Sequence, residues 1–204
     1  AASDVYKRQA MMVQQNPKAY VNLGIVNMQQ KDYSEAVKNF RKAVKLDKYN
    51  SKAYSLWASC LSEIGDYEGS VEVYEMAKKY DPRNPEIYLN WAISLAKFDK
   101  KDDAEEKFKN AASLDPTNPV IPLLWGVLLF ERKKYKEAIS KFSHSALYSA
   151  DKYDVSYYTA LCYLKMGNNE QAVKYASTAK ECRPEMTEPY LILGEAYMLS
   201  LIHI

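Results

Sequence analysis

The chain has 204 residues, and its 28 lysines and arginines nearly balance 26 aspartates and glutamates, which leaves a formal net charge of +2 at pH 7. Because the acidic and basic residues are interleaved, the composition argues against nucleic acid or an anionic membrane as an obligate partner. The sequence has no run of about 18 apolar residues, so it predicts no membrane span.

A period of 34 residues organises the sequence. Trp57, Trp91 and Trp125 stand 34 residues apart, and rows of this length align without insertion or deletion. A fixed period in this range predicts stacked supersecondary units. We therefore place full repeats at 17–50, 51–84, 85–118, 119–152 and 153–186, a partial repeat with a non-repeat tail at 187–204, and a flank with the tail of a preceding repeat at 1–16.

Each row predicts a helix, a short turn and a second, antiparallel helix. In the first row, apolar residues recur at helical spacing in two stripes, one around Tyr20 and Leu23 and one around Phe40, with a polar break at 29–32 between them. The later rows repeat this pattern in chain order, with breaks at 65–66, 99–102, 132–134 and 167–169. Several rows end in proline-containing turns, where a proline is well tolerated beside a helix end.

Two columns of the alignment explain how the helices of a row pack. One column holds only small residues, which let the partner helix approach closely: Gly24, Ala58, Ala92, Gly126, Ala160 and Gly194. The other holds the side chains that fill the space: Phe40, Tyr74, Phe108, Phe142 and Ala176. One pair cannot bury both of its faces, so neighbouring pairs must stack. The three tryptophans should be largely buried between consecutive pairs, and truncating one should cost roughly 3–5 kcal/mol.

This pattern resembles the tetratricopeptide repeat over about residues 10 to 199. The resemblance implies an all-α fold, a right-handed superhelical solenoid of antiparallel helix pairs. The fourth row departs from the family pattern at Pro122 and Ser145, and the fifth at Ser156, Thr159 and Ala176. Pro122 falls in the first turn of its helix, where it is tolerated.

The two ends do not follow the repeat. Residues 1–9 and 199–204 resemble translated sequencing-adaptor read-through, and the last helix, about Glu188 to Leu199, is apolar on two sides with no capping helix after it. We therefore expect the chain to be a piece of a longer protein, whose uncapped repeat ends can self-associate. The alternative is a true terminus with ordinary fraying.

No group of residues predicts catalysis, so we expect no enzyme activity, no cofactor and no metal. His144 stands alone on a helix, and no Cys/His cluster has zinc spacing. Cys60 and Cys162 share a column three rows apart, too distant for a disulfide. We expect all three cysteines, with Cys182, to be packing residues, which favours a reducing compartment such as the cytoplasm.

The resemblance implies that the first helices line a concave groove that binds a protein or peptide with hydrophobic anchors. The second row is polar there, with three serines, whereas rows three to five are apolar. The alternative is that these side chains pack against the next row or a missing element. The candidate groove residues are Val21, Asn22, Ile25, Ser55, Ser59, Leu89, Asn90, Ile93, Leu123, Val127, Phe130, Tyr157, Leu161 and Leu164.

Two binding modes of the family are disfavoured by particular residues. The leading lysine of a two-carboxylate clamp is replaced by Val21, Ser55 and Leu89, which argues against chaperone-tail binding. A groove ladder of asparagines is present only at Asn22 and Asn90. The sequence thus favours a protein–protein interaction scaffold. The alternative is the substrate-recruiting repeat arm of a larger enzyme, such as a glycosyltransferase, whose catalytic domain is not in this chain.

Overall fold

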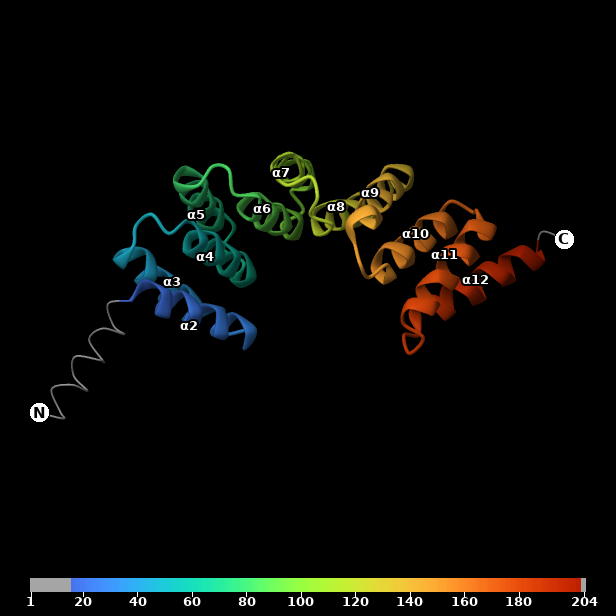
Figure 1. Cartoon of the computed structure of the whole chain (residues 1–204), viewed down its shortest axis with the longest axis horizontal. Helices are drawn as coiled ribbons and strands as arrows, with labels where there is room; N and C mark the ends of the chain where they lie inside the picture. Colours follow the sequence, from blue (N-terminus) through green and yellow to red (C-terminus); the bar gives the residue numbers. More distant parts are fainter. Residues whose placement is uncertain (1–15, 203–204) are drawn as a thin grey trace, which may run out of the picture. The chain divides into compact units, whose positions relative to one another are not determined.

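The computed structural model describes residues 16–202, which form eleven α-helices (Figure 1). The helices are α2 (Pro17–Gln29), α3 (Tyr33–Leu46), α4 (Ser51–Ile64), α5 (Tyr67–Tyr80), α6 (Pro85–Lys97), α7 (Lys101–Leu114), α8 (Val120–Glu131), α9 (Tyr135–Tyr148), α10 (Tyr153–Lys165), α11 (Asn169–Cys182) and α12 (Glu188–Ile202). Within this part of the chain, no helix is long and apolar enough to cross a membrane.

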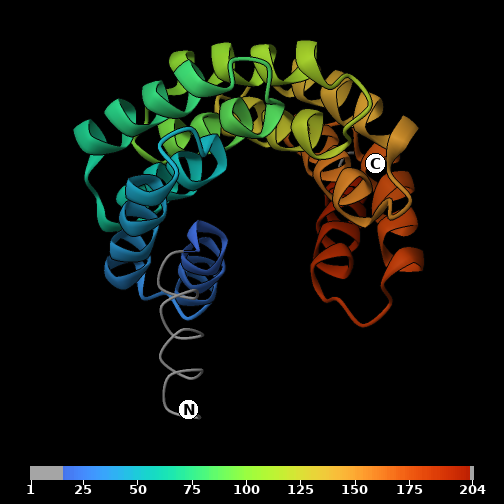
Figure 2. The same ribbon diagram turned by 60° about the vertical axis from the view of Figure 1, so that its left-hand side comes forward.

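The helices pack as antiparallel pairs, which confirms the all-α repeat fold. The chain divides into two compact units, one ending at Leu114 with α2 to α7 and one starting at Asp115 with α8 to α12. In the first unit the pairs are α2 with α3, α4 with α5 and α6 with α7, which Figure 2 shows in blue to green. In the second unit α8 pairs with α9 and α10 with α11, and α12 packs against α11.

The turn inside each pair has the same geometry in all five repeats. Its central residue has a positive φ, between 57° and 93°, whether it is glycine or not: Lys31, Gly65, Asp99, Lys133 and Gly167. The next residue then donates its N–H to a carbonyl five positions back, as Asp32 does to Asn27 at 2.9 Å. This is the closing bond of a Schellman turn, which satisfies an otherwise unpaired carbonyl. The repeat therefore imposes a left-handed turn even where the sequence supplies no glycine.

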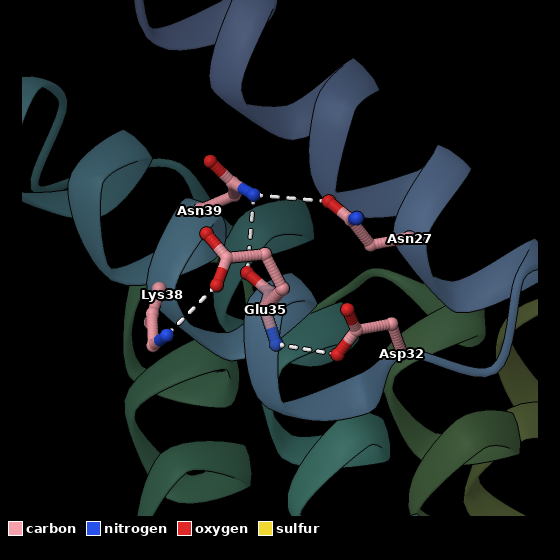
Figure 3. A network of polar contacts seen from close by, with 5 residues as sticks. All are labelled: Asn27, Asp32, Glu35, Lys38 and Asn39. Carbon is pink, nitrogen blue, oxygen red and sulfur yellow. Dashed lines mark hydrogen bonds and ion pairs between the residues drawn. The ribbon is translucent and has the colours of Figure 1, made fainter.

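Asparagine and aspartate side chains fix where several helices begin. Asp32, Asp66 and Asn168 each accept a hydrogen bond from the backbone N–H three residues on, at 3.0–3.1 Å. Figure 3 shows this cap in the first pair, where Asn39 of α3 also donates to Asn27 of α2 at 3.0 Å. The turn residues therefore both start the second helix and tie it to the first.

The small column lets the two helices of a pair approach closely, as expected. A Cβ added at Gly24 would lie 2.6 Å from the ring of Phe40, and one added at Gly126 would also collide with the ring of Phe142. Both rings are fully buried. The family departure at Ser145 is accommodated because its buried hydroxyl donates to the carbonyl of Pro119 at 2.8 Å.

The tryptophan and cysteine columns are not uniform. Trp91 is 3% exposed, which confirms its expected burial, whereas Trp57 and Trp125 are only half-buried. Cys60 and Cys162 are buried, as expected. The prediction that Cys182 packs inside was wrong, since this last residue of α11 is exposed.

The structure describes only part of the two ends that depart from the repeat. Residues 1–9 and 203–204 lie outside the described residues. Residues 199–202 continue helix α12 without a break.

Candidate functional site

The candidate groove residues lie on the first helices of the pairs. On α2, α4 and α6 they belong to the first unit, and on α8 and α10 to the second. Their exposure differs. Asn22 and Ile93 are exposed, and Val21, Ser55 and Leu164 are buried. The remainder are partly buried: Ile25, Ser59, Leu89, Asn90, Leu123, Val127, Phe130, Tyr157 and Leu161.

The three serines of α4 have partners inside the first unit. Ser55 accepts a hydrogen bond from Asn90 of α6 at 3.3 Å, and Ser62 donates to Ser70 of α5 at 2.9 Å. Ser59 lies 2.8 Å from the hydroxyl of Tyr74. These bonds join α4 to its neighbours, so the serines stabilise the packing of the helices.

Tyr74 is the centre of this polar network. Its ring is fully buried on α5, and its hydroxyl lies 2.8 Å from Ser59 of α4 and 2.9 Å from Ser94 of α6. Burial raises the pKa of Tyr74 to about 12, against the opposing effect of the two serine hydrogen bonds. The sequence does not indicate this network, because Tyr74 stands in a column that otherwise holds phenylalanine or alanine.

Among the candidate groove residues of the first unit, Ile93 is the exposed apolar side chain. Its side chain is 40% exposed on α6, one turn from the partly buried Leu89 and Asn90. A cavity of about 20 Å³ between α4 and α6 reaches Asn90 and Ser55, enough for about one water molecule. Lys97 of α6 and Glu63 of α4 form an ion pair that joins the two helices.

The corresponding surface in the second unit is apolar and aromatic. Phe130 of α8 packs on Tyr158 of α10, with ring centroids 6.3 Å apart, and Tyr157 lies edge-on to Tyr158 at 5.2 Å. Leu123 and Val127 pack, with Phe130, against the buried cluster around Leu129 and Phe142. These side chains therefore support the core and also keep part of their surface accessible.

Tyr158 of α10, which is not among the candidate groove residues, links this surface to the core of the second unit. Its ring stacks on Phe142 at 5.7 Å and joins α10 to the α8–α9 pair. Desolvation raises the pKa values of Tyr157 and Tyr158, as expected for phenols on a partly buried apolar surface. In the sequence, the three tyrosines at 153, 157 and 158 are the feature that could have indicated this aromatic surface.

The described residues contain no cluster of three or more His, Cys, Asp or Glu side chains that could hold a metal ion. His144 lies edge-on to Tyr148 of the same helix, with ring centroids 5.7 Å apart. The candidate groove residues carry apolar side chains, amides, and serine and tyrosine hydroxyls.

Comparison with known proteins supports the repeat assignment. Residues 17–50 match a family model described as tetratricopeptide repeat, and residues 154–181 match a second model of the same description. Among proteins with curated descriptions, none matches this sequence.

Solved structures share the fold at low sequence identity. The yeast Tom70 crystal structure has a TM-score of 0.78 and 17% identity, over 98% of this chain and 43% of that chain. YrrB, described as a TPR protein with an unusual peptide-binding site, has a TM-score of 0.65 and 17% identity, over 91% of this chain and 95% of that chain. A thermophilic TPR protein of Thermus thermophilus has a TM-score of 0.70 and 16% identity, over 89% and 99%. At these identities the similarity shows the fold alone.

Proposed function

Because this chain is a tetratricopeptide-repeat protein, we propose that it is a protein–protein interaction scaffold whose first helices bind a peptide segment with hydrophobic anchors. Proteins with these repeats are typically non-catalytic scaffolds. The peptide-binding site described for YrrB belongs to that protein, and it supports the same use of the fold here.

The observation that carries the proposal is the set of partly exposed apolar side chains on α8 and α10. Leu123, Val127 and Phe130 lie on α8, and Tyr157 and Leu161 on α10. Aromatic and aliphatic side chains held by a packed core are effective anchors, because little conformational entropy is lost when a peptide covers them.

The surface of the first unit adds polar recognition to a smaller apolar area. Ile93 would contact an apolar anchor of the peptide. Ile25 stands in the same column of the repeat as Ile93, and Leu89 lies one turn before Ile93 on α6. Asn22 is exposed, and Asn90 has an amide whose bond to Ser55 is long, at 3.3 Å. Each amide can donate to and accept from a peptide main chain. Ser59 and the buried Val21, Ser55 and Leu164 would act by holding these helices in place.

The test is selection of binding peptides from a displayed random library, followed by titration of a selected peptide against variants. We expect the selected peptides to be rich in leucine, isoleucine and aromatic residues. Ile93→Asp should lower the affinity of peptides for the first unit by at least about tenfold, and Val127→Asp should do the same for the second unit. Each substitution places a charge against an apolar anchor of the peptide.

Leu147→Asp is the matched control, because Leu147 is 74% exposed but lies on the second helix α9. It should leave binding unchanged. Circular dichroism must show that every variant keeps its helices. Full affinity in the Ile93→Asp, Val127→Asp double variant would overturn the assignment of the binding surface.

A further inference from the structure

The first helices of the second unit carry carboxylates as well as apolar side chains. Helix α10 contacts both α8 and α12, the first helices that precede and follow it (Figure 1). Glu131 is the last residue of α8, Asp154 lies in the first turn of α10, and Glu188 is the first residue of α12. Glu131 and Asp154 are exposed, and Glu188 is partly exposed. Each of these three helices therefore contributes one accessible carboxylate.

Asp154 lies on the same face of α10 as Tyr157 and Tyr158. The two tyrosines stand three and four residues after Asp154, which is the spacing of neighbouring side chains on a helix surface. Both tyrosines are partly exposed, and their rings lie edge-on to each other with centroids 5.2 Å apart. This face of α10 therefore presents two aromatic rings one turn away from a negative charge.

The carboxylates of the two neighbouring helices act on the same rings. Desolvation is the largest cause of the raised pKa of Tyr158, and the charges of Asp154 and Glu131 add to it. Desolvation also raises the pKa of Tyr157, to which Tyr158 and the charge of Glu188 contribute further. A carboxylate opposes ionisation of a phenol only over a short range, so all three carboxylates border these two tyrosines.

The unit does not neutralise these carboxylates itself. Within residues 16–202, no ion pair joins any of the three to a lysine or arginine. The bases closest along the chain have other positions, because Arg183 pairs with Asp151, Lys152 precedes α10, and Lys165 ends it. The surface between the ends of α10 thus keeps a negative charge, which a positive side chain of a partner complements.

The same tyrosine row already holds one guanidinium of the chain. Arg183 lies over the ring of Tyr153, with its guanidinium carbon 4.6 Å from the ring centroid, and it pairs with Asp151. The ring of Tyr157 lies parallel to that of Tyr153 one turn further along α10, with centroids 6.1 Å apart. A guanidinium is planar, so it can stack on an aromatic ring and bond to a carboxylate at the same time. Tyr157 and Asp154 offer a partner's arginine the same combination.

The first unit carries the opposite charge at the corresponding positions. Asp154 and Glu188 share one column of the 34-residue alignment, and in the first unit this column holds Lys18, Lys52 and Glu86. Two of the three equivalent side chains are therefore positive. A positively charged peptide is favoured by the second unit and opposed by this column of the first unit.

We propose that the second unit selects peptides in which an arginine stands close to an apolar anchor. The guanidinium stacks on Tyr157 and binds the carboxylate of Asp154. Glu131 and Glu188 add electrostatic attraction from the neighbouring helices. The apolar anchor covers Phe130 and its neighbours on α8, so the inference rests on the proposed function. The arginine then decides which of the two units a peptide occupies.

The experiment uses two displayed peptide libraries with random apolar residues around one fixed residue, which is arginine in the first library and glutamate in the second. The full chain is the target. A peptide is assigned to the second unit when Val127→Asp weakens its binding and Ile93→Asp does not. We expect the second-unit peptides to come from the arginine library. Equal yields from the two libraries would overturn the role of arginine and leave the peptide-binding surface intact, whereas no second-unit peptide from either library would overturn both.

Titration of a selected arginine peptide by fluorescence anisotropy tests the charge contact. Citrulline in place of the arginine keeps its shape but removes its charge, and it should lower the affinity at least about tenfold. Asp154→Lys should also lower the affinity of the arginine peptide and raise that of the same peptide with glutamate. Glu170→Lys is the matched control, because Glu170 is an exposed acid in the first turn of the second helix α11, and it should change neither affinity. Equal affinity of the arginine and citrulline peptides would overturn the proposal.

Two variants of Tyr157 test the stacking contact. Tyr157→Phe keeps the aromatic face and should bind the arginine peptide as the wild type does. Tyr157→Leu should weaken the arginine peptide more than the citrulline peptide, because the charge of the guanidinium is what the aromatic face attracts. Circular dichroism must show that each variant keeps its helices. An equal loss for the two peptides in Tyr157→Leu would overturn the placement of the arginine on this ring.

Discussion

Replacing glycine by alanine at two equivalent positions, Gly126 and Gly194, should shift stability in opposite directions. Both residues lie in the small column, and both are in the interior of a first helix. In α8 the added methyl group of Gly126→Ala would overlap the ring of Phe142, whereas in α12 the methyl group of Gly194→Ala would have nothing within 4 Å. The substitution is the same at both positions. They differ because a ring of the second helix covers Gly126, whereas no side chain among the described residues covers Gly194.

The magnitudes follow from two opposing contributions. Alanine stabilises a helix interior relative to glycine by up to about 1 kcal/mol. Overpacking a filled core costs about 1–3 kcal/mol, and Phe142 is fully buried, so its ring has little room to retreat. We expect Gly126→Ala to lower the free energy of unfolding by about 1 kcal/mol and Gly194→Ala to raise it by up to about 1 kcal/mol. The two variants should therefore differ by roughly 2 kcal/mol.

The assay must read stability locally, because repeat proteins do not always unfold in one step. Native-state hydrogen exchange of the amides in α8 and α9 reports on Gly126→Ala, and exchange in α11 and α12 reports on Gly194→Ala. Urea unfolding followed by tryptophan fluorescence, to which Trp125 beside Gly126 contributes together with Trp57 and Trp91, provides an independent measure.

Equal shifts at the two positions would refute the reasoning. So would a gain of stability in Gly126→Ala, because it would mean that the ring of Phe142 moves at no cost. Ala92 shows that this column does accept alanine opposite a buried ring, Phe108, so the predicted cost belongs to the close α8–α9 pair.

The remaining predictions concern the turn, the polar network and the thiols. Lys133→Gly should stabilise the protein by about 0.5–1 kcal/mol in urea unfolding, because φ of Lys133 is 59° and a non-glycine residue is strained there; unchanged stability would contradict this. Tyr74→Phe should cost about 1–2 kcal/mol in the same assay, since it leaves two serine hydroxyls without their shared partner, and a neutral result would mean that water replaces the phenol. Burial raises the pKa values of the Cys60 and Cys162 thiols from 9.0 to about 12. The stability that these thiols contribute is therefore full below about pH 9 and is lost as the pH rises towards about 12. Cys60→Ala should reduce that loss, and a wild-type stability that does not change with pH in this range would contradict the prediction. At pH 8 a thiol reagent should label one cysteine of the native protein, the exposed Cys182, and labelling of all three would contradict the burial of the others.

The sequence by itself determined the helix pairs. The contacts that define a pair, such as Gly24 with Phe40, join residues within one repeat, and the same two columns place a small residue opposite an aromatic ring in four of the five rows. Even the turn is implied by the period, because Gly65 and Gly167 mark a position whose left-handed backbone Lys31 and Lys133 also adopt. Local, repeated contacts leave a periodic signal that a single sequence can reveal.

Only the tertiary structure decided which side chains of a column are accessible. Trp91 is buried while Trp57 and Trp125 are half-buried, although all three share one column. The printed ring contacts differ from row to row: Trp91 stacks on Tyr74 of the neighbouring pair, whereas Lys141 of its own pair lies over Trp125. The inward bonds of Ser59 through Tyr74 to Ser94 likewise join three helices and depend on atoms brought together by stacking. A column predicts the residue type that a position accepts, whereas its exposure and its hydrogen-bond partner depend on what packs against it.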